Sequence, residues 1–138
     1  MKLQHLSPIL WTKNLEETTS FYANVLGFSV HSNFPDFVSL FKDEVQIMFV
    51  VPEEEPEDCK DPNSKEEFFR KPNLTGNIYI TTNNVDDIWN SIQGKAEIKS
   101  TIADRQYLMR DFSIVDNNGY ELCFGQDISN TNKSRSTL

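Results

Sequence analysis

The chain carries two copies of one pattern of apolar and polar positions. Residues 7–14 form a short apolar run that ends in Asn14, and residues 77–84 repeat this run 70 positions later, ending in Asn84. An acidic residue follows each asparagine at the third position, Glu17 in the first copy and Asp87 in the second. An asparagine with an acid three residues on satisfies free amide groups at a helix N-terminus and suits the helix dipole. We therefore predict that each run is a strand followed at once by a helix.

The next segments support the two helices. Apolar residues recur near helical spacing and a glycine closes each series, Gly27 in the first copy and Gly94 in the second. A glycine after the last periodic residue is typical of a helix C-terminus, because it adopts the left-handed conformation without strain. The apolar positions are Leu15, Phe21, Tyr22, Val25 and Leu26 in the first copy and Val85, Ile88, Trp89 and Ile92 in the second.

Beyond each helix the apolar period shortens to two, which is typical of β-strands. Residues 37–41 and 45–50 form one pair of alternating runs, and residues 112–116 and 120–124 match them at an offset of 75 without a gap. Asn118 and Gly119 supply a strong hairpin-turn signal in the second pair. Each half is therefore predicted as strand, helix and about three strands, a βαβββ module.

The two modules predict a single α+β domain over residues 1–138. Module one spans residues 5–51, module two spans 76–126, and residues 127–138 form a polar, flexible tail. The connector, residues 52–75, is rich in acidic residues and proline. It is interpreted as a solvated linker, with a loop that lids a pocket as the alternative.

Composition narrows the possible partners. The chain of 138 residues is 38% hydrophobic, which is enough for a packed core, and its formal net charge is -8. Because nucleic acids and anionic membranes bind positive surfaces, neither is an expected partner, whereas a cationic ligand is compatible with the charge. The two cysteines form no disulfide framework, and we find no long apolar run and no signal-peptide core. We expect a cytoplasmic protein.

Two stretches resemble one known superfamily. Residues 15–28, with an aromatic pair before a Leu-Gly-Phe ending, are similar to the first helix of vicinal-oxygen-chelate proteins, and residues 109–119 resemble their last hairpin. This superfamily contains glyoxalase I, extradiol dioxygenases, fosfomycin-resistance enzymes and bleomycin-resistance proteins, and the last branch is the most similar. The resemblance covers residues 5–126. It implies a curved mixed sheet with a concave cleft, and a homodimer in which protomers exchange strands.

The resemblance also indicates which positions would hold a metal ion. Metal-dependent members take His, Gln or Glu ligands from four strand positions, which fall here on Ser7, Met48, Asn77 and Cys123. These side chains do not match the nitrogen and carboxylate ligands that zinc, nickel, manganese or iron use in such enzymes. His5, on the same strand face as Ser7, could replace one ligand, and a soft-metal site at Met48 and Cys123 is the other alternative. We expect no metal and no cofactor.

Strand alternation predicts which side chains line the cleft. Ile78 and Ile80 are expected under the helix, so Tyr79 points to the opposite face, and the repeat places Trp11 on the equivalent face. Trp11 and Tyr79 could instead be dimer contacts, and Glu121 could be solvated. The face of Arg110, like that of Tyr107, is not assigned by the pattern. The predicted ligand-binding residues are Ser7, Trp11, Gln46, Met48, Asn77, Tyr79, Arg110, Glu121 and Cys123.

Three functions follow from these expectations. The first is a metal-free, non-catalytic binding protein that sequesters a small molecule in a cleft of a homodimer, as bleomycin-resistance proteins do. The second is a metal-dependent lyase, isomerase or dioxygenase with non-standard ligands. The third is an interaction protein whose concave faces serve dimerisation alone. A neutral cleft with two aromatic side chains and few charges favours the first.

Overall fold

The computed structural model describes residues 1–52, 74 and 76–130. The chain divides into two compact units, residues 1–72 (unit 1) and residues 73–138 (unit 2). Most of the predicted connector and of the predicted tail lies outside the described residues. In the part of the chain that the structure describes, no helix is long and apolar enough to cross a membrane.

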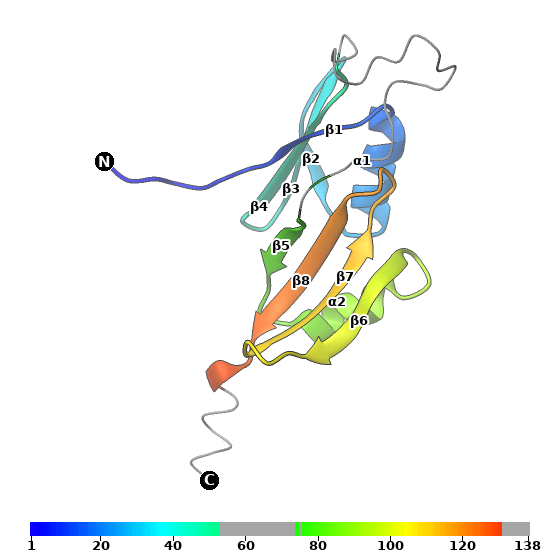
Figure 1. Cartoon of the computed structure of the whole chain (residues 1–138). Helices are drawn as coiled ribbons and strands as arrows, with labels where there is room; N and C mark the ends of the chain where they lie inside the picture. The colour runs from blue at the N-terminus through cyan, green and yellow to red at the C-terminus, as the bar shows by residue number, and fades with distance from the viewer. Residues whose placement is uncertain (53–73, 75, 131–138) are drawn as a thin grey trace, which may run out of the picture. The chain divides into compact units, whose positions relative to one another are not determined.

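Unit 1 is a βαβββ module (Figure 1). Its four strands form one mixed sheet in the order β1-β4-β3-β2, in which β1 runs parallel to β4 and the other neighbours are antiparallel. The elements are β1 (Ile9–Trp11), α1 (Leu15–Asn24), β2 (Ser29–Phe34), β3 (Phe37–Lys42) and β4 (Val45–Val50).

Unit 2 repeats this topology. Its sheet has the order β5-β8-β7-β6, again with one parallel pair, between β5 and β8. The two modules and the α+β class are therefore as predicted, with two mixed four-stranded sheets; a cleft formed by both modules stays a prediction. The elements are β5 (Ile78–Thr81), α2 (Val85–Ile92), β6 (Glu97–Asp104), β7 (Met109–Val115) and β8 (Glu121–Asp127), so β8 includes the first residue of the predicted tail.

Both helices begin and end where the sequence indicates. The side chain of Asn14 accepts a hydrogen bond from the amide of Glu17 at 2.9 Å, and Asn84 accepts one from Asp87 at 3.2 Å. The chain leaves both helices through left-handed glycines, with φ of 78° at Gly27 and 77° at Gly94. The repeated pattern of the sequence thus reflects a repeated pair of caps.

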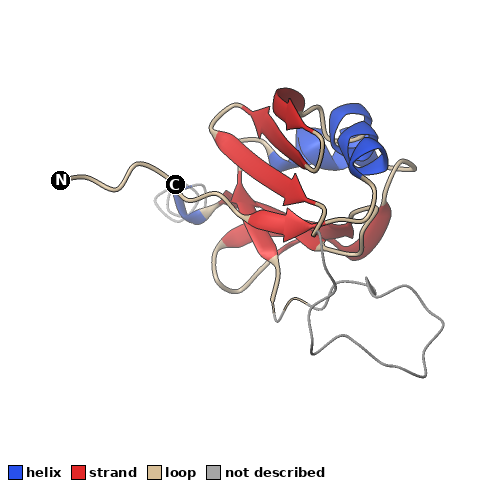
Figure 2. Ribbon diagram, turned by 90° about the horizontal axis from the view of Figure 1, so that it is seen from above, coloured by secondary structure: helices blue, strands red, loops and turns tan. Residues whose placement is uncertain are grey.

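Each unit has its own core, between the helix and one face of its sheet. Helix α1 packs on β2 and β3, and α2 packs on β7 and β8 (Figure 2). In unit 1, Tyr22 of the helix meets Phe49 edge to face, with 5.1 Å between ring centroids. In unit 2, Trp89 meets Phe112 in the same way at 5.1 Å. The helix-facing side of each sheet is thereby filled.

The opposite side of each sheet carries the predicted site residues. We name them the Trp11 face of unit 1 and the Tyr79 face of unit 2. The pairings place the following residues on them: Ile9, Trp11, Phe37, Ser39, Phe41, Gln46, Met48 and Val50 on the Trp11 face, and Tyr79, Thr81, Ser100, Asp111, Ser113, Glu121, Cys123 and Gly125 on the Tyr79 face.

Candidate functional site

A buried carboxylate organises the Tyr79 face. Asp111 of β7 is 3% exposed. Its Oδ2 atom accepts hydrogen bonds from the phenol groups of Tyr79, at 3.0 Å, and Tyr107, at 2.6 Å. Its Oδ1 atom accepts one from Nε of Arg105 at 2.8 Å. We call these four side chains the Asp111 cluster. A carboxylate out of water is stable only when it is paired in this way.

Backbone geometry brings the members together. Arg105 and Tyr107 lie in the loop between β6 and β7, where the amide of Arg105 donates to the carbonyl of Met109 at 2.7 Å. Leu108 adopts a left-handed φ of 62°, which lets the loop reverse so sharply. Tyr79 comes from β5, and its ring lies over Gly125, where a Cβ atom would overlap the phenol group. A glycine on β8 is thus required for Tyr79 to reach β7.

The cluster fixes the charge states of its members. Burial raises the pKa of Asp111, but the hydrogen bonds from Tyr107, Arg105 and Tyr79 outweigh this effect, so the pKa lies below its ordinary value. Burial and the hydrogen bond to Asp111 raise the pKa of Tyr79, and the same hydrogen bond is the main reason that the pKa of Tyr107 is raised. Around neutral pH the carboxylate is therefore ionised and both phenols keep their protons.

Next to the cluster lie a thiol and an unpartnered hydroxyl. Burial, and then the negative charges of Asp111 and Glu121, raise the pKa of the Cys123 thiol to about 11. This thiol is therefore protonated at neutral pH and is a poor nucleophile. Ser113, the neighbour of Cys123 across the sheet, is 2% exposed, and its hydroxyl has no hydrogen-bond partner. A buried hydroxyl of this kind marks a place for a further polar atom.

The Trp11 face is mostly apolar. Ile9 is 58% exposed and Trp11 is 40% exposed, beside Met48 and Val50 of the neighbouring strand. One polar chain crosses this face: Ser7 donates to Oε1 of Gln46 at 2.9 Å, and the amide nitrogen of Gln46 donates to Ser39 at 2.8 Å. Three aromatic side chains of β2 and β3 lie at the other end of this sheet: Phe34, Phe37 and Phe41.

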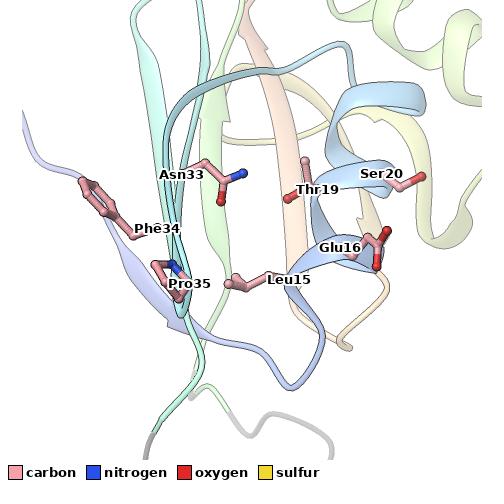
Figure 3. A pocket seen from close by; sticks show the side chains of 7 residues that line it. All are labelled: Leu15, Glu16, Thr19, Ser20, Asn33, Phe34 and Pro35. Atoms are coloured by element: carbon pink, nitrogen blue, oxygen red, sulfur yellow. The ribbon is translucent and has the colours of Figure 1, made fainter.

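A shallow groove opens elsewhere on unit 1, between α1 and the turn that joins β2 to β3. Its volume is about 660 Å³. Figure 3 shows Asn33 of β2 and Thr19 of α1 pointing toward one another within it, with Leu15 and Pro35 at one end. The groove contains none of the predicted site residues.

The structure separates the predicted site residues into groups. Ser7, Trp11, Gln46 and Met48 share the Trp11 face, and Tyr79, Glu121 and Cys123 share the Tyr79 face. Glu121 is not merely solvated, because it pairs with Lys99 at 3.3 Å. Asn77, which precedes β5, is exposed.

Arg110 is not brought together with these residues. It points to the helix side of unit 2, where its Nε and Nη2 atoms donate to Asp86 of α2 at 3.1 and 3.0 Å. Its Nη1 atom donates to Asp104 of β6 at 2.9 Å. Because strand residues alternate between faces, its neighbour Asp111 takes the Tyr79 face instead. Arg110, which was predicted to bind ligand without an assigned face, therefore joins α2 to the sheet and does not line the Tyr79 face.

Sequence reasoning missed two of the four members of the Asp111 cluster, Asp111 and Arg105. Tyr107 was recognised without a face, but Arg105, Asp111, Ser113 and Gly125 were not singled out. One signal was present: the alternation that places Cys123 on the Tyr79 face also places Gly125 there, and a glycine inside a strand often marks a close approach of another group.

The donors at the four positions that the resemblance assigns to metal ligands do not fit zinc, nickel, manganese or iron. The Ser7 hydroxyl donates to Gln46, Met48 offers a thioether, Asn77 offers an amide, and the Cys123 thiol is protonated at neutral pH. Among residues 1–52, 74 and 76–130, no three His, Cys, Asp or Glu side chains are grouped so that they could hold a metal. His5 is exposed in the segment before β1. Nothing in this donor set resembles the nitrogen and oxygen ligands of such sites.

Comparison with known proteins identifies the family. The model of the Glyoxalase/Bleomycin resistance protein/Dioxygenase superfamily matches residues 2–124, which is most of the chain. The chain belongs to this superfamily. The predicted branch is not resolved, since the matching model covers glyoxalases, bleomycin-resistance proteins and dioxygenases together. A search of curated proteins finds no match.

Several solved structures have the same fold. A protein of unknown function from Agrobacterium tumefaciens is 20% identical, with a TM-score of 0.69 over 92% of this chain and 96% of its own. A glyoxalase/bleomycin resistance protein/dioxygenase from Alicyclobacillus acidocaldarius is 15% identical, with a TM-score of 0.69 over 93% and 94%. A lactoylglutathione lyase from Agrobacterium tumefaciens is 15% identical, with a TM-score of 0.63 over 89% and 92%. At these identities the likeness concerns the fold alone.

Proposed function

We propose that this chain is a metal-independent, non-catalytic binding protein that sequesters a small organic ligand and acts as a homodimer. The observation that carries the proposal is the donor set at the superfamily's metal positions. Lyase and dioxygenase chemistry on this scaffold requires a metal ion as Lewis acid. A hydroxyl, a thioether, an amide and a protonated thiol are not the ligands that hold such an ion. No alternative nucleophile is activated, because the pKa of Cys123 is raised rather than lowered.

The two sheet faces suit binding. The Trp11 face offers exposed apolar and aromatic side chains, and the Tyr79 face offers hydrogen-bonding groups held in fixed positions by Asp111. Apolar walls with a few fixed polar groups are typical of small-molecule sites. A cationic ligand is favoured by the net charge of -8.

Calorimetric titration of the untagged protein with bleomycin, metal-free and copper-loaded, tests the proposal. Saturable binding near one drug per chain is expected. The chain has two tryptophans, so Trp89→Phe leaves Trp11 as the only fluorescent reporter, and Trp11→Phe leaves Trp89, which packs on the helix side. Quenching that persists in Trp89→Phe and disappears in Trp11→Phe places the ligand on the Trp11 face.

Two results would contradict the proposal. The first is the absence of any heat or quenching up to about 1 mM, where the binding free energy is only about 4 kcal/mol. That result would exclude bleomycin as the ligand and would favour the alternative in which the two sheet faces serve dimerisation alone. The second is a stoichiometric divalent metal retained by the untagged protein, which would favour the metal-dependent alternative.

A further inference from the structure

The Asp111 cluster has a defined hydrogen-bond polarity. An ionised carboxylate accepts hydrogen bonds and donates none. Because Tyr79 Oη and Tyr107 Oη lie 3.0 and 2.6 Å from the same Oδ2 atom, each phenol must give its single hydrogen to Asp111. Each phenol oxygen then has only lone pairs left for any other partner. Both oxygens belong to exposed side chains, Tyr79 at 41% and Tyr107 at 63%.

The cation of the cluster is engaged within unit 2. Arg105 donates through Nε to Asp111 at 2.8 Å, and through Nη2 to Ser100 at 3.1 Å and to the carbonyl of Thr101 at 2.8 Å. Its charge is balanced by Asp111, so it is a weak partner for an incoming anion. The other cation on this face, Lys99, is paired with Glu121. The Tyr79 face therefore presents the phenol oxygens as hydrogen-bond acceptors, and the positive charges of Arg105 and Lys99 are balanced by neighbouring carboxylates.

A second observation points to a ligand at this place. The Ser113 hydroxyl is buried and unpartnered beside Cys123, on the same face as Tyr79 and Asp111. Leaving a buried hydroxyl without a partner costs free energy, so a polar atom is expected to reach it. A serine hydroxyl can accept or donate a hydrogen bond, so Ser113 is able to add an acceptor to those that the two phenol oxygens present on this face.

We propose that Asp111 is a positioning residue that holds Tyr79 and Tyr107 as hydrogen-bond acceptors, so that the Tyr79 face selects ligands with a protonated amine, amidine or guanidine and rejects carboxylates. The inference rests on the proposed binding function and adds the chemical class of the ligand. Asp111 acts through the phenols and does not touch the ligand. Because Arg105 balances the charge of Asp111, the selection rests on the direction of the hydrogen bonds that the two phenols can make.

Benzamidine and benzoate form a matched pair of probes, because they share a planar ring. Benzamidine is a cation that donates hydrogen bonds, and benzoate is an anion that accepts them. Each is titrated into ¹⁵N-labelled full-length protein, and the amide shifts of β7 and β8 are followed. Benzamidine is expected to shift the amides of Asp111, Cys123 and Gly125 with saturation, and benzoate is expected to leave them unchanged.

Substitutions distinguish a positioning role of Asp111 from a general loss of structure. Tyr107→Phe and Tyr79→Phe each remove one acceptor and are expected to weaken benzamidine binding about 3- to 10-fold. Tyr120→Phe, which removes a phenol outside the cluster, is the control and should change nothing. Asp111→Asn frees the phenols to donate outward and leaves the charge of Arg105 unbalanced, so the ratio of benzoate to benzamidine affinity should rise. A purely structural loss would weaken both probes equally. The ¹⁵N spectrum of each variant reports whether it is folded.

Three outcomes would overturn the inference, and they are distinguishable. Benzoate binding at the same amides as tightly as benzamidine would refute the polarity and leave the proposed function standing. If neither probe shifts β7 or β8, and bleomycin produces no heat, the face is not a recognition site and the proposed function fails with the inference. Unchanged benzamidine affinity in both tyrosine variants would also refute it.

Discussion

Substitution of Gly125 is the most direct test of how Tyr79 reaches Asp111. An alanine Cβ at this position would overlap the Tyr79 phenol, so Gly125→Ala must push the ring off β8 and away from Asp111. A hydrogen bond to a charged group contributes about 1.5–3 kcal/mol, and the lower end applies because Tyr79 is partly exposed. Replacing a strand glycine by alanine returns about 0.5–1 kcal/mol. The net expectation is a loss of about 1 kcal/mol in the free energy of unfolding.

A double-mutant cycle isolates the cause. In a Tyr79→Ala background the ring is absent, so the same Gly125→Ala change should stabilise the protein by about 0.5–1 kcal/mol. The sign of the effect therefore reverses between the two backgrounds. Urea unfolding of proteins that also carry Trp11→Phe measures it, because Trp89 packs on Phe112 in the core of unit 2 and reports that unit. Equal losses in both backgrounds would refute the claim that Gly125 exists to admit Tyr79.

Three further predictions test single features of unit 2. The pKa of Asp111 is lowered in the fold, so the contribution of Asp111 to stability is complete above its unfolded pKa of about 3.9 and is lost as the pH falls through the folded value. The free energy of unfolding of Asp111→Asn in urea should therefore depend less steeply on pH below about 4 than that of the unsubstituted protein. With Cys59 replaced by serine, alkylation of Cys123 by iodoacetamide should be slow at pH 8 and accelerate toward pH 11, and fast, pH-independent labelling would contradict its raised pKa. Because Leu108 has a left-handed φ, Leu108→Gly should be about 1 kcal/mol more stable than Leu108→Ala in urea, and equal stabilities would show that the loop carries no strain.

The sequence was sufficient to predict the repeated elements because local chemistry specifies them. The side chains of Asn14 and Asn84 cap the two helices, and Gly27 and Gly94 end them. The offset of 75 between the hairpins was also informative. It matched Met48 with Cys123, and the structure places each of them opposite the first strand of its own unit, beside Ile9 and Tyr79.

The strand that directly follows the helix in each module was expected without bounds. Strands β2 and β6 lie at the edges of their sheets, and the register shifts along both of them, near Ser32 in β2 and near Ser100 in β6. Edge strands bury only a few side chains and bulges interrupt the alternation of faces, so the period-two pattern that marked the other strands is lost here.

The Asp111 cluster was not predictable because it depends on a loop reversal and on one close approach. Arg105 and Tyr107 return to Asp111 only because Leu108 adopts a conformation that is uncommon for a residue with a side chain. No glycine marks this turn in the sequence. Tyr79 reaches the same carboxylate from a strand that is distant in the chain, across Gly125, and such pairings follow from the sheet topology rather than from local spacing.

The most direct test of metal-independent binding is one titration of metal-free bleomycin performed in two conditions. The untagged protein is first dialysed against EDTA and then freed of the chelator. A second sample is incubated with Zn²⁺ and freed of unbound metal by gel filtration, because bleomycin itself binds metal ions. Metal-independent binding predicts the same stoichiometry and the same Kd in both samples, because the proposed function gives the side chains of Ser7, Met48, Asn77 and Cys123 no metal to hold. Binding that appears only in the zinc-loaded sample would contradict the account, and so would the absence of binding in both.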